Sequence, residues 1–153
     1  MILRTYRAPG SVMDALLDQP RFEGRGLAML MGGCAMIAIS TLPHLLAQTS
    51  AVPNEARVSA TLFAWLAIAP LAFYAIALVL DLLRRLIRLP SDGYTTRIAL
   101  FWSVLAATPL WLLNGIGLTI PNETIKLVFG LIALIGFLFL VSAHLRAAYR
   151  RKT

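Results

Sequence analysis

The sequence predicts an all-α fold: a polytopic membrane protein formed by a four-transmembrane-helix bundle with an N-terminal interfacial amphipathic helix. First, 59% of the 153 residues are apolar and the mean hydropathy is +0.77, which is too apolar for a soluble domain of this size. Second, the apolar stretches run for about 20 residues with almost no charge, which is the length that crosses the hydrocarbon layer. Third, the basic residues lie outside these stretches in a regular pattern.

The basic residues predict the topology. Twelve of the fourteen Lys and Arg residues lie before the first apolar stretch, between the second and third, or after the fourth. Only Arg57 and Lys126 lie in the two other connections. Connections rich in Lys and Arg stay in the cytoplasm, so we expect one integral membrane domain over residues 1–153 with cytoplasmic N- and C-termini. The excess of Arg over Lys is typical of GC-rich bacterial genomes, so a bacterial inner membrane is the expected location.

The positive charge has two interpretations. A net charge of +7 and a pI near 10.5 could indicate nucleic-acid binding, but no soluble face is left to carry such a patch, so no nucleic-acid partner is expected. Arginines near the ends of membrane spans are instead typical of contact with anionic lipid headgroups. We expect such contacts at seven arginines: Arg21, Arg25, Arg88, Arg97, Arg146, Arg150 and Arg151.

Residues 8–20 are expected to form a short amphipathic helix on the membrane surface, ended by Pro20. Met13, Leu16 and Leu17 share one face of this helix. A helix of this length is marginal alone, so it needs the interface or the bundle to hold it. It would act as a docking or lipid-sensing element, or would only guide the chain into the membrane.

Four apolar stretches are predicted to span the membrane, at about 26–46, 58–83, 98–120 and 125–145. The second helix is expected to continue along the inner leaflet to Leu89, because its end is amphipathic. Trp102 and Trp111 are expected to anchor the two ends of the third span at the interfaces. Gly130 and Gly136 in the fourth span predict close approach of another helix.

Prolines interrupt the second and third spans near their middles, at Pro70 and Pro109, within the similar segments LAIAPL and LAATPL. Each proline removes a backbone hydrogen bond and should bend its helix. Interrupted helices at matching positions surround the substrate sites of some transporters, so a midplane site beside the prolines and Asn114 is one interpretation. In the other, the prolines serve packing, and Asn114 hydrogen-bonds to a neighbouring helix or to a carbonyl freed by Pro109.

The charged and ionisable residues favour structural roles. Asp81 precedes Arg84 and Arg85 by three and four residues, the favourable order for helical ion pairs, so an ion pair is preferred over a proton carrier. His44 and His144 lie near opposite membrane faces, so they cannot form a metal site or a base–nucleophile pair. His144 is expected to be an interfacial cation near the end of the last helix.

Catalytic motifs of the common hydrolase, nucleotide-binding and thiol–disulfide types do not occur in the sequence. We therefore predict no enzyme, no catalytic residue, no cofactor and no metal.

The order of several motifs resembles the Yip family, the Ypt/Rab-interacting integral membrane proteins, in its short bacterial branch. The resemblance covers most of the chain: the helix PGSVMDALL, the motif A-P-L-x-x-Y at 69–74, the glycine-bearing turn followed by 94–97, and A-x-x-P-L at 106–110. It implies a multi-span membrane protein without catalytic residues. Eukaryotic members associate with small GTPases and vesicle traffic, whereas bacterial relatives largely lack an assigned activity. This chain shows four spans where five are usual, and it lacks the long N-terminal region of larger members.

The expected function is therefore non-enzymatic. We expect a small inner-membrane protein that acts through helix–helix and lipid contacts as a partner or accessory subunit of a membrane protein complex. Its expected partners are anionic lipids and other integral membrane proteins. The alternatives are a small transporter or channel with a site near Pro70, Pro109 and Asn114, and lipid remodelling by the amphipathic segments.

Overall fold

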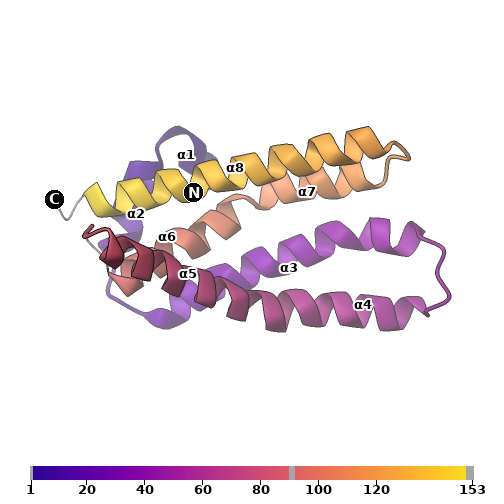
Figure 1. The fold of residues 1–153 in the computed structure, drawn as a ribbon, viewed down its shortest axis with the longest axis horizontal. Helices are drawn as coiled ribbons and strands as arrows, with labels where there is room; N and C mark the ends of the chain where they lie inside the picture. Colours follow the sequence, from indigo (N-terminus) through magenta and orange to yellow (C-terminus); the bar gives the residue numbers. More distant parts are fainter. Residues whose placement is uncertain (1, 90–91, 151–153) are drawn as a thin grey trace.

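The structure, a computed structural model, describes residues 2–89 and 92–150, and the regular structure in these ranges is helical. The long helices lie side by side in an elongated bundle (Figure 1). In chain order the elements are α1 (Ile2–Arg7), α2 (Pro9–Leu17), α3 (Glu23–Ala47), α4 (Asn54–Phe63), the π-helical turn η1 (Ala64–Ile68), α5 (Ala69–Leu86), α6 (Gly93–Ala106), α7 (Thr108–Leu118) and α8 (Glu123–Arg150).

Three helices are long and apolar enough to cross a membrane: α3, the continuous rod Asn54–Leu86 formed by α4, η1 and α5, and α8. The pair α6 and α7 meets the same criteria together but is bent by 41°. The described chain thus contains three such helices, or four when the bent pair counts as one span. This is the architecture expected of a multi-pass membrane protein.

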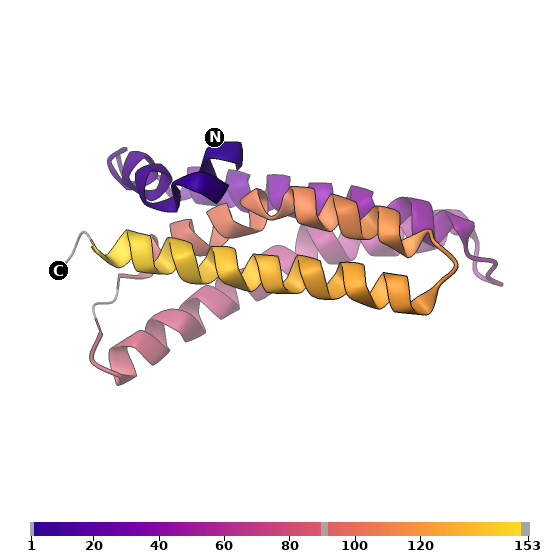
Figure 2. The same ribbon diagram turned by 90° about the horizontal axis from the view of Figure 1, so that it is seen from above.

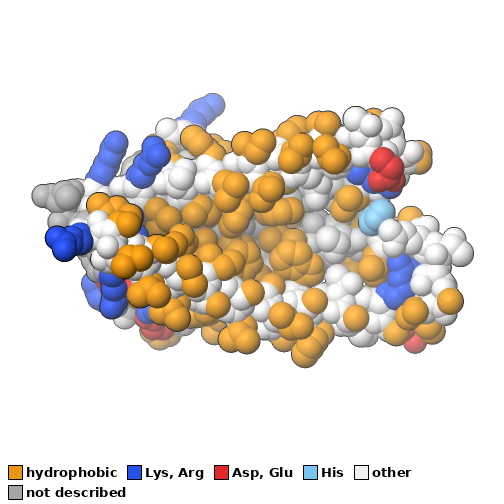
Figure 3. Space-filling view, viewed as in Figure 1, with side chains coloured by type: hydrophobic (Ala, Val, Ile, Leu, Met, Phe, Trp, Pro, Cys, Tyr) orange, Lys and Arg blue, Asp and Glu red, His pale blue; other side chains and the backbone are white. Residues whose placement is uncertain are grey.

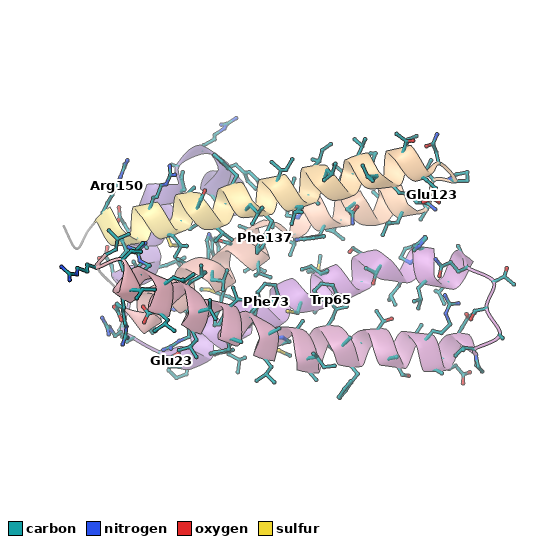
Figure 4. All side chains as sticks on the ribbon, in the orientation of Figure 1. Glu23, Trp65, Phe73, Glu123, Phe137 and Arg150 are labelled. Carbon is teal, nitrogen blue, oxygen red and sulfur yellow. The ribbon has the colours of Figure 1, made fainter. Side chains whose placement is uncertain are left out.

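The charged residues divide the bundle into two unlike ends. Glu23 and Arg150 lie toward one end and Glu123 lies at the other (Figure 4). Most blue side chains gather at the first of these ends, while orange side chains cover the middle of the face shown (Figure 3). We call this first end the basic end and define it by Arg21, Arg25, Arg84, Arg85, Arg88, Arg97, Arg146 and Arg150.

Helix α6 forms the centre of the bundle. Apart from Arg97, its side chains are mostly buried around the whole circumference, and a helix with that pattern is stable only when it is surrounded. Leu100, Phe101 and Val104 pack with α3 and α5, and Ile98 and Trp102 pack with α2 and α8. The other long helices keep one face uncovered, with many large aliphatic side chains exposed.

Two glycines let α3 approach the bent pair closely. A Cβ atom on Gly33 would lie 2.9 Å from a methyl group of Val104 and 3.2 Å from the backbone nitrogen of Leu105. A Cβ on Gly115 would collide with the backbone carbonyl of Ser40. Small residues at such crossings allow van der Waals contact between helix backbones, which is the main source of packing energy inside a membrane.

The end of α5 differs from the prediction. The helix stops at Leu86 and does not continue to Leu89. The amide of Leu89 donates to the carbonyl of Arg84, and that of Arg88 donates to Arg85, which is the Schellman pattern of a helix end. Arg88 holds φ at 56°, a left-handed conformation that glycine usually occupies at this position.

The N-terminal helices pack on the bundle near its basic end (Figure 2). In α2, Val12, Met13 and Leu16 are buried against α6 and α8. The apolar face predicted for residues 8–20 therefore contacts protein, and the helix spans the shorter range Pro9–Leu17. Helix α1 was not predicted, and its polar side chains reach α6.

Candidate functional site: the polar contacts and the groove at the basic end

The break between α6 and α7 originates from Pro109, which has no amide hydrogen to donate. Two carbonyls at the end of α6 receive side-chain donors. The hydroxyl of Thr108 donates to the carbonyl of Leu105 at 2.8 Å. The hydroxyl of Tyr6 in α1 donates to the carbonyl of Ala106 at 2.7 Å. The N-terminal helix thus caps the broken helix.

Trp102 makes a second contact between α1 and α6. Its indole Nε1 donates to the hydroxyl of Thr5 at 3.1 Å, and the indole is only 5% exposed. The expectation that Trp102 anchors the membrane interface is wrong, because its donor is satisfied inside the protein. Trp111 is half-buried and packs against the apolar core.

A buried histidine joins α6 to α8. The Nδ1 atom of His144 shares a hydrogen bond of 2.7 Å with the hydroxyl of Ser103, and the ring is fully buried. Its Nε2 atom has no hydrogen-bond partner among the described residues. The expectation of an interfacial cation is wrong, because α8 continues to Arg150 and places His144 more than a turn inside the helix.

Asp81 lies at the α5 end of a larger polar network. Its Oδ2 atom pairs with Arg85 at 2.8 Å, and its Oδ1 atom accepts from the hydroxyl of Thr96 at 3.4 Å. The guanidinium of Arg84 lies over the ring of Tyr149, 3.7 Å from its centroid. Asp81 is buried, so the ion pair with Arg85 offsets the cost of a carboxylate away from water.

The turn before α6 connects this network to α8. The hydroxyl oxygen of Tyr149 lies 2.7 Å from that of Thr96 and 3.2 Å from the carbonyl oxygen of Asp92. The side chain of Asp92 accepts from the amide of Tyr94 and caps α6. Asp92 also pairs with Arg21 at 3.0 Å. The sequence did not indicate this network, because its Thr and Tyr members match no motif.

Arg21, Arg25 and Arg97, which were expected at lipid headgroups, make contacts within the chain. Arg21 pairs with Asp92, and Arg97 pairs with Glu23. Arg25 donates to the hydroxyl of Tyr94 at 3.0 Å and to the carbonyls of Leu16 and Pro20. These contacts fix the segment between α2 and α3 on the start of α6.

Three more of these arginines lie around the same end. Arg88 is exposed in the turn after α5, and Arg146 and Arg150 are exposed on the last turns of α8. Arg151 lies outside the described residues.

A groove of about 500 Å³ opens between α5 and the first turn of α6. Its lining changes from charged to apolar along its length. Asp81, Arg85 and Arg97 line the part near the basic end, and Tyr74 and Leu78 line the part further in. A second groove of similar size between α2 and α8 is lined by Asp14, Phe139, Ala143, Arg146 and Arg150.

The three residues of the predicted midplane site lie on two elements, α5 and α7. Pro70 is buried in α5 directly after the π-helical turn, and this rod packs on α3 and α6. Pro109 and Asn114 lie in α7, which packs on α3 and α8. The Oδ1 atom of Asn114 is buried without a hydrogen-bond partner among the described residues, and a Cβ on Gly130 would be 3.7 Å from it. Asn114 thus faces α8.

Comparisons of this chain with protein-family models, with curated proteins and with solved structures find no match. The fold supports the class of multi-pass helical membrane proteins. The resemblance to the Yip family remains a prediction from the order of motifs along the sequence.

Proposed function

We propose that the chain crosses a bacterial inner membrane four times, with α6 and α7 forming one bent span and the basic end in the cytoplasm. The distribution of charge along the sequence supports this orientation, since twelve of the fourteen basic residues lie before the first apolar stretch, between the second and third, or after the fourth. Of the two other basic residues, Lys126 is neutralised by a nearby acidic residue and Arg57 is bound by groups of the loop after α3. Lys126 pairs with Glu123 at 2.7 Å, and Arg57 donates to the backbone and side chain of Gln48.

Within this membrane, we propose a non-enzymatic role as a partner or accessory subunit of a membrane protein complex. The observation that carries this proposal is the uncovered face of the rod Asn54–Leu86, of whose most apolar stretch only 17% is buried. Helix α8, at 11%, is uncovered as well but lacks the π-helical turn of the rod. Leu71, Leu78, Leu82 and Leu86 on this rod are 62–78% exposed. A helix of another membrane protein that docks along this face would gain packing contacts that the chain itself does not provide.

The π-helical turn η1 lies within this rod and supports the proposal. Pro70 has no amide hydrogen for the preceding turn, and the backbone responds by widening into a five-residue π-helical segment. Single π-helical turns inside longer helices are rare overall. Those that do occur are found frequently at functional sites.

The proposal is tested by purification from native membranes in a mild detergent, followed by native gel electrophoresis. We expect a stoichiometric complex that Leu82→Trp and Leu86→Trp disrupt together. The matched control places tryptophans at Leu134 and Leu138, which are exposed on α8. A strictly monomeric wild-type protein, or equal effects of both pairs, would contradict the proposal.

A small transporter or channel is the second candidate, and the unpartnered Oδ1 atom of Asn114 favours it. A polar atom left unpaired in an apolar interior is costly, so it is often retained because a ligand or ion needs it. The measurement is solute flux into vesicles that contain the protein. This candidate requires flux in the wild type and its loss in Asn114→Leu.

A further inference from the structure

We propose that the groove between α5 and the start of α6 binds one anionic phospholipid from the leaflet at the basic end, with its phosphate at Arg85 and Arg97 and one acyl chain along the apolar part. This inference rests on the proposed membrane topology and adds a specific ligand site to it.

The shape of the groove fits one leaflet. Its α5 wall includes Leu71, Tyr74, Leu78, Asp81 and Arg85, which are spaced by three or four residues and share one face of the helix. The ten residues from Leu71 to Asp81 rise about 15 Å along the helix axis. This length is half of the hydrocarbon thickness of about 30 Å, which is the depth of one acyl layer.

The charges at the mouth of the groove suit a phosphate. A guanidinium has five N–H donors. Arg85 and Arg97 each pair with one carboxylate and have further donors that could bind a phosphate. The Nε atom of Arg97 is buried and has no hydrogen-bond partner among the described residues. Arginine binds phosphate oxygens with paired donors, so a headgroup at this position would satisfy groups that the protein leaves open.

The carboxylates near the groove do not oppose this ligand. Both oxygens of Asp81 already accept hydrogen bonds, one from Thr96 and one from Arg85. Glu23 pairs with Arg97 and is 60% exposed, so it can turn toward water when a phosphate approaches. Arg84 and Arg88 lie on the same end of α5 and keep the local charge positive.

The inner part of the groove distinguishes a lipid from an acidic protein segment. Ala75 and Ala77 are small, and Leu71 and Leu78 border them with aliphatic surface. The hydroxyl of Tyr74 makes no hydrogen bond within the described part of the chain, while its ring packs edge-on against Phe101 at 4.8 Å. An acyl chain would pack along this apolar part of the groove, whereas an acidic protein segment would contact only the charged part near the basic end.

Native mass spectrometry of the detergent-purified full chain tests the site. Phosphatidylglycerol, phosphatidylcholine and inorganic phosphate are added in separate samples. We expect one retained phosphatidylglycerol per chain, little retained phosphatidylcholine, and no displacement by inorganic phosphate. Arg85→Gln combined with Arg97→Gln should lower the phosphatidylglycerol occupancy about tenfold or more, because each arginine provides charge-assisted hydrogen bonds.

Two matched controls make the result specific to the groove. Ala75→Trp fills the groove and should abolish retention, whereas Ala72→Trp places the same ring on α5 outside the groove and should leave it intact. Arg88→Gln removes one exposed arginine outside the groove and should also leave it intact. Circular dichroism of each variant in detergent without lipid shows that it is folded.

Equal retention in all variants, equal retention of both lipids, or displacement by inorganic phosphate would overturn the inference. A water-soluble wild-type protein would overturn the proposed topology together with the site. A membrane-embedded protein that retains no phosphatidylglycerol would overturn the lipid site alone.

Discussion

Tyr6 donates its hydroxyl hydrogen to the carbonyl of Ala106, a hundred residues further along the chain, at 2.7 Å. Leu110 does not use this carbonyl, because its amide donates to Ala107 at 3.0 Å instead. The same break therefore bends the chain between α6 and α7 and creates the acceptor that holds the N-terminal helix.

Tyr6→Phe should destabilise the protein by about 1 kcal/mol, because the carbonyl of Ala106 loses its donor. The measurement is thermal unfolding in detergent, followed by circular dichroism. Tyr74→Phe is the matched control, since its hydroxyl has no hydrogen bond within the described residues, and it should have no effect. Equal effects of the two changes would argue against the cap.

The same hydroxyl should give the stability an alkaline limit. Burial raises the pKa of Tyr6 above its ordinary value of 10.0. Since the folded-state pKa exceeds the unfolded one, this contribution is fully present below pH 10 and is lost as the pH rises through the folded-state pKa. The difference in melting temperature between wild type and Tyr6→Phe, measured from pH 7 to 11, should shrink only at the alkaline end.

Ser103 and His144 should be energetically coupled. Ser103→Ala leaves the Nδ1 atom of His144 unpaired in the interior and should cost about 1–3 kcal/mol. In His144→Leu, the hydroxyl of Ser103 keeps its hydrogen bond to the carbonyl of Ala99. The loss of hydrogen bonding should therefore cost less stability in His144→Leu than in Ser103→Ala. The double variant should be less destabilised than the sum of the single ones, which unfolding of all four proteins would show. Strict additivity would mean that the pair does not interact.

Gly115→Ala should destabilise the protein by about 1–3 kcal/mol, because the added methyl group meets the backbone of Ser40 and α3 must move away. Gly10→Ala is the control, since a Cβ there has nothing within 4 Å. It should be neutral or stabilise α2 by up to about 1 kcal/mol. A tolerated Gly115→Ala would contradict the close crossing of α3 and α7.

Arg88→Gly should stabilise the protein by about 1 kcal/mol, because glycine adopts the left-handed conformation at this helix end without strain. Arg88→Ala removes the same charge but keeps the Cβ atom. A gain that appears with glycine and not with alanine in unfolding experiments identifies the backbone as the cause. Equal gains would assign it to charge.

The proposed orientation predicts a labelling pattern. Cys34 is buried, so it gives little background with a membrane-impermeant maleimide. In spheroplasts, Thr49→Cys should react in the loop after α3, and Leu89→Cys should react only after the membrane is permeabilised. The opposite pattern would place the basic end outside the cell.

The sequence predicted the positions of the long helices within a few residues, because apolar length and charge are local properties. The stretch expected at 26–46 lies within α3, and that expected at 125–145 lies within α8. It also anticipated the pairing of Asp81 with Arg85, since both lie on one face of a helix.

The roles of the polar residues depended on contacts between distant segments. Trp102 and His144 are of residue types that suit a membrane interface. Inside the protein, however, Thr5 and Ser103 provide their hydrogen-bond partners. Nothing in the sequence near either residue specifies these partners. The end of α5 was also missed, because Arg88 occupies a position where a glycine would have been the usual signal.

The contacts of α1 have a consequence for biogenesis. Thr5 and Tyr6 leave the ribosome before any other element described here, but their partners Trp102 and Ala106 are synthesised about a hundred residues later. Docking must wait until the bent pair of α6 and α7 has been synthesised. Helix α1 is therefore among the last of the described elements to reach its final place.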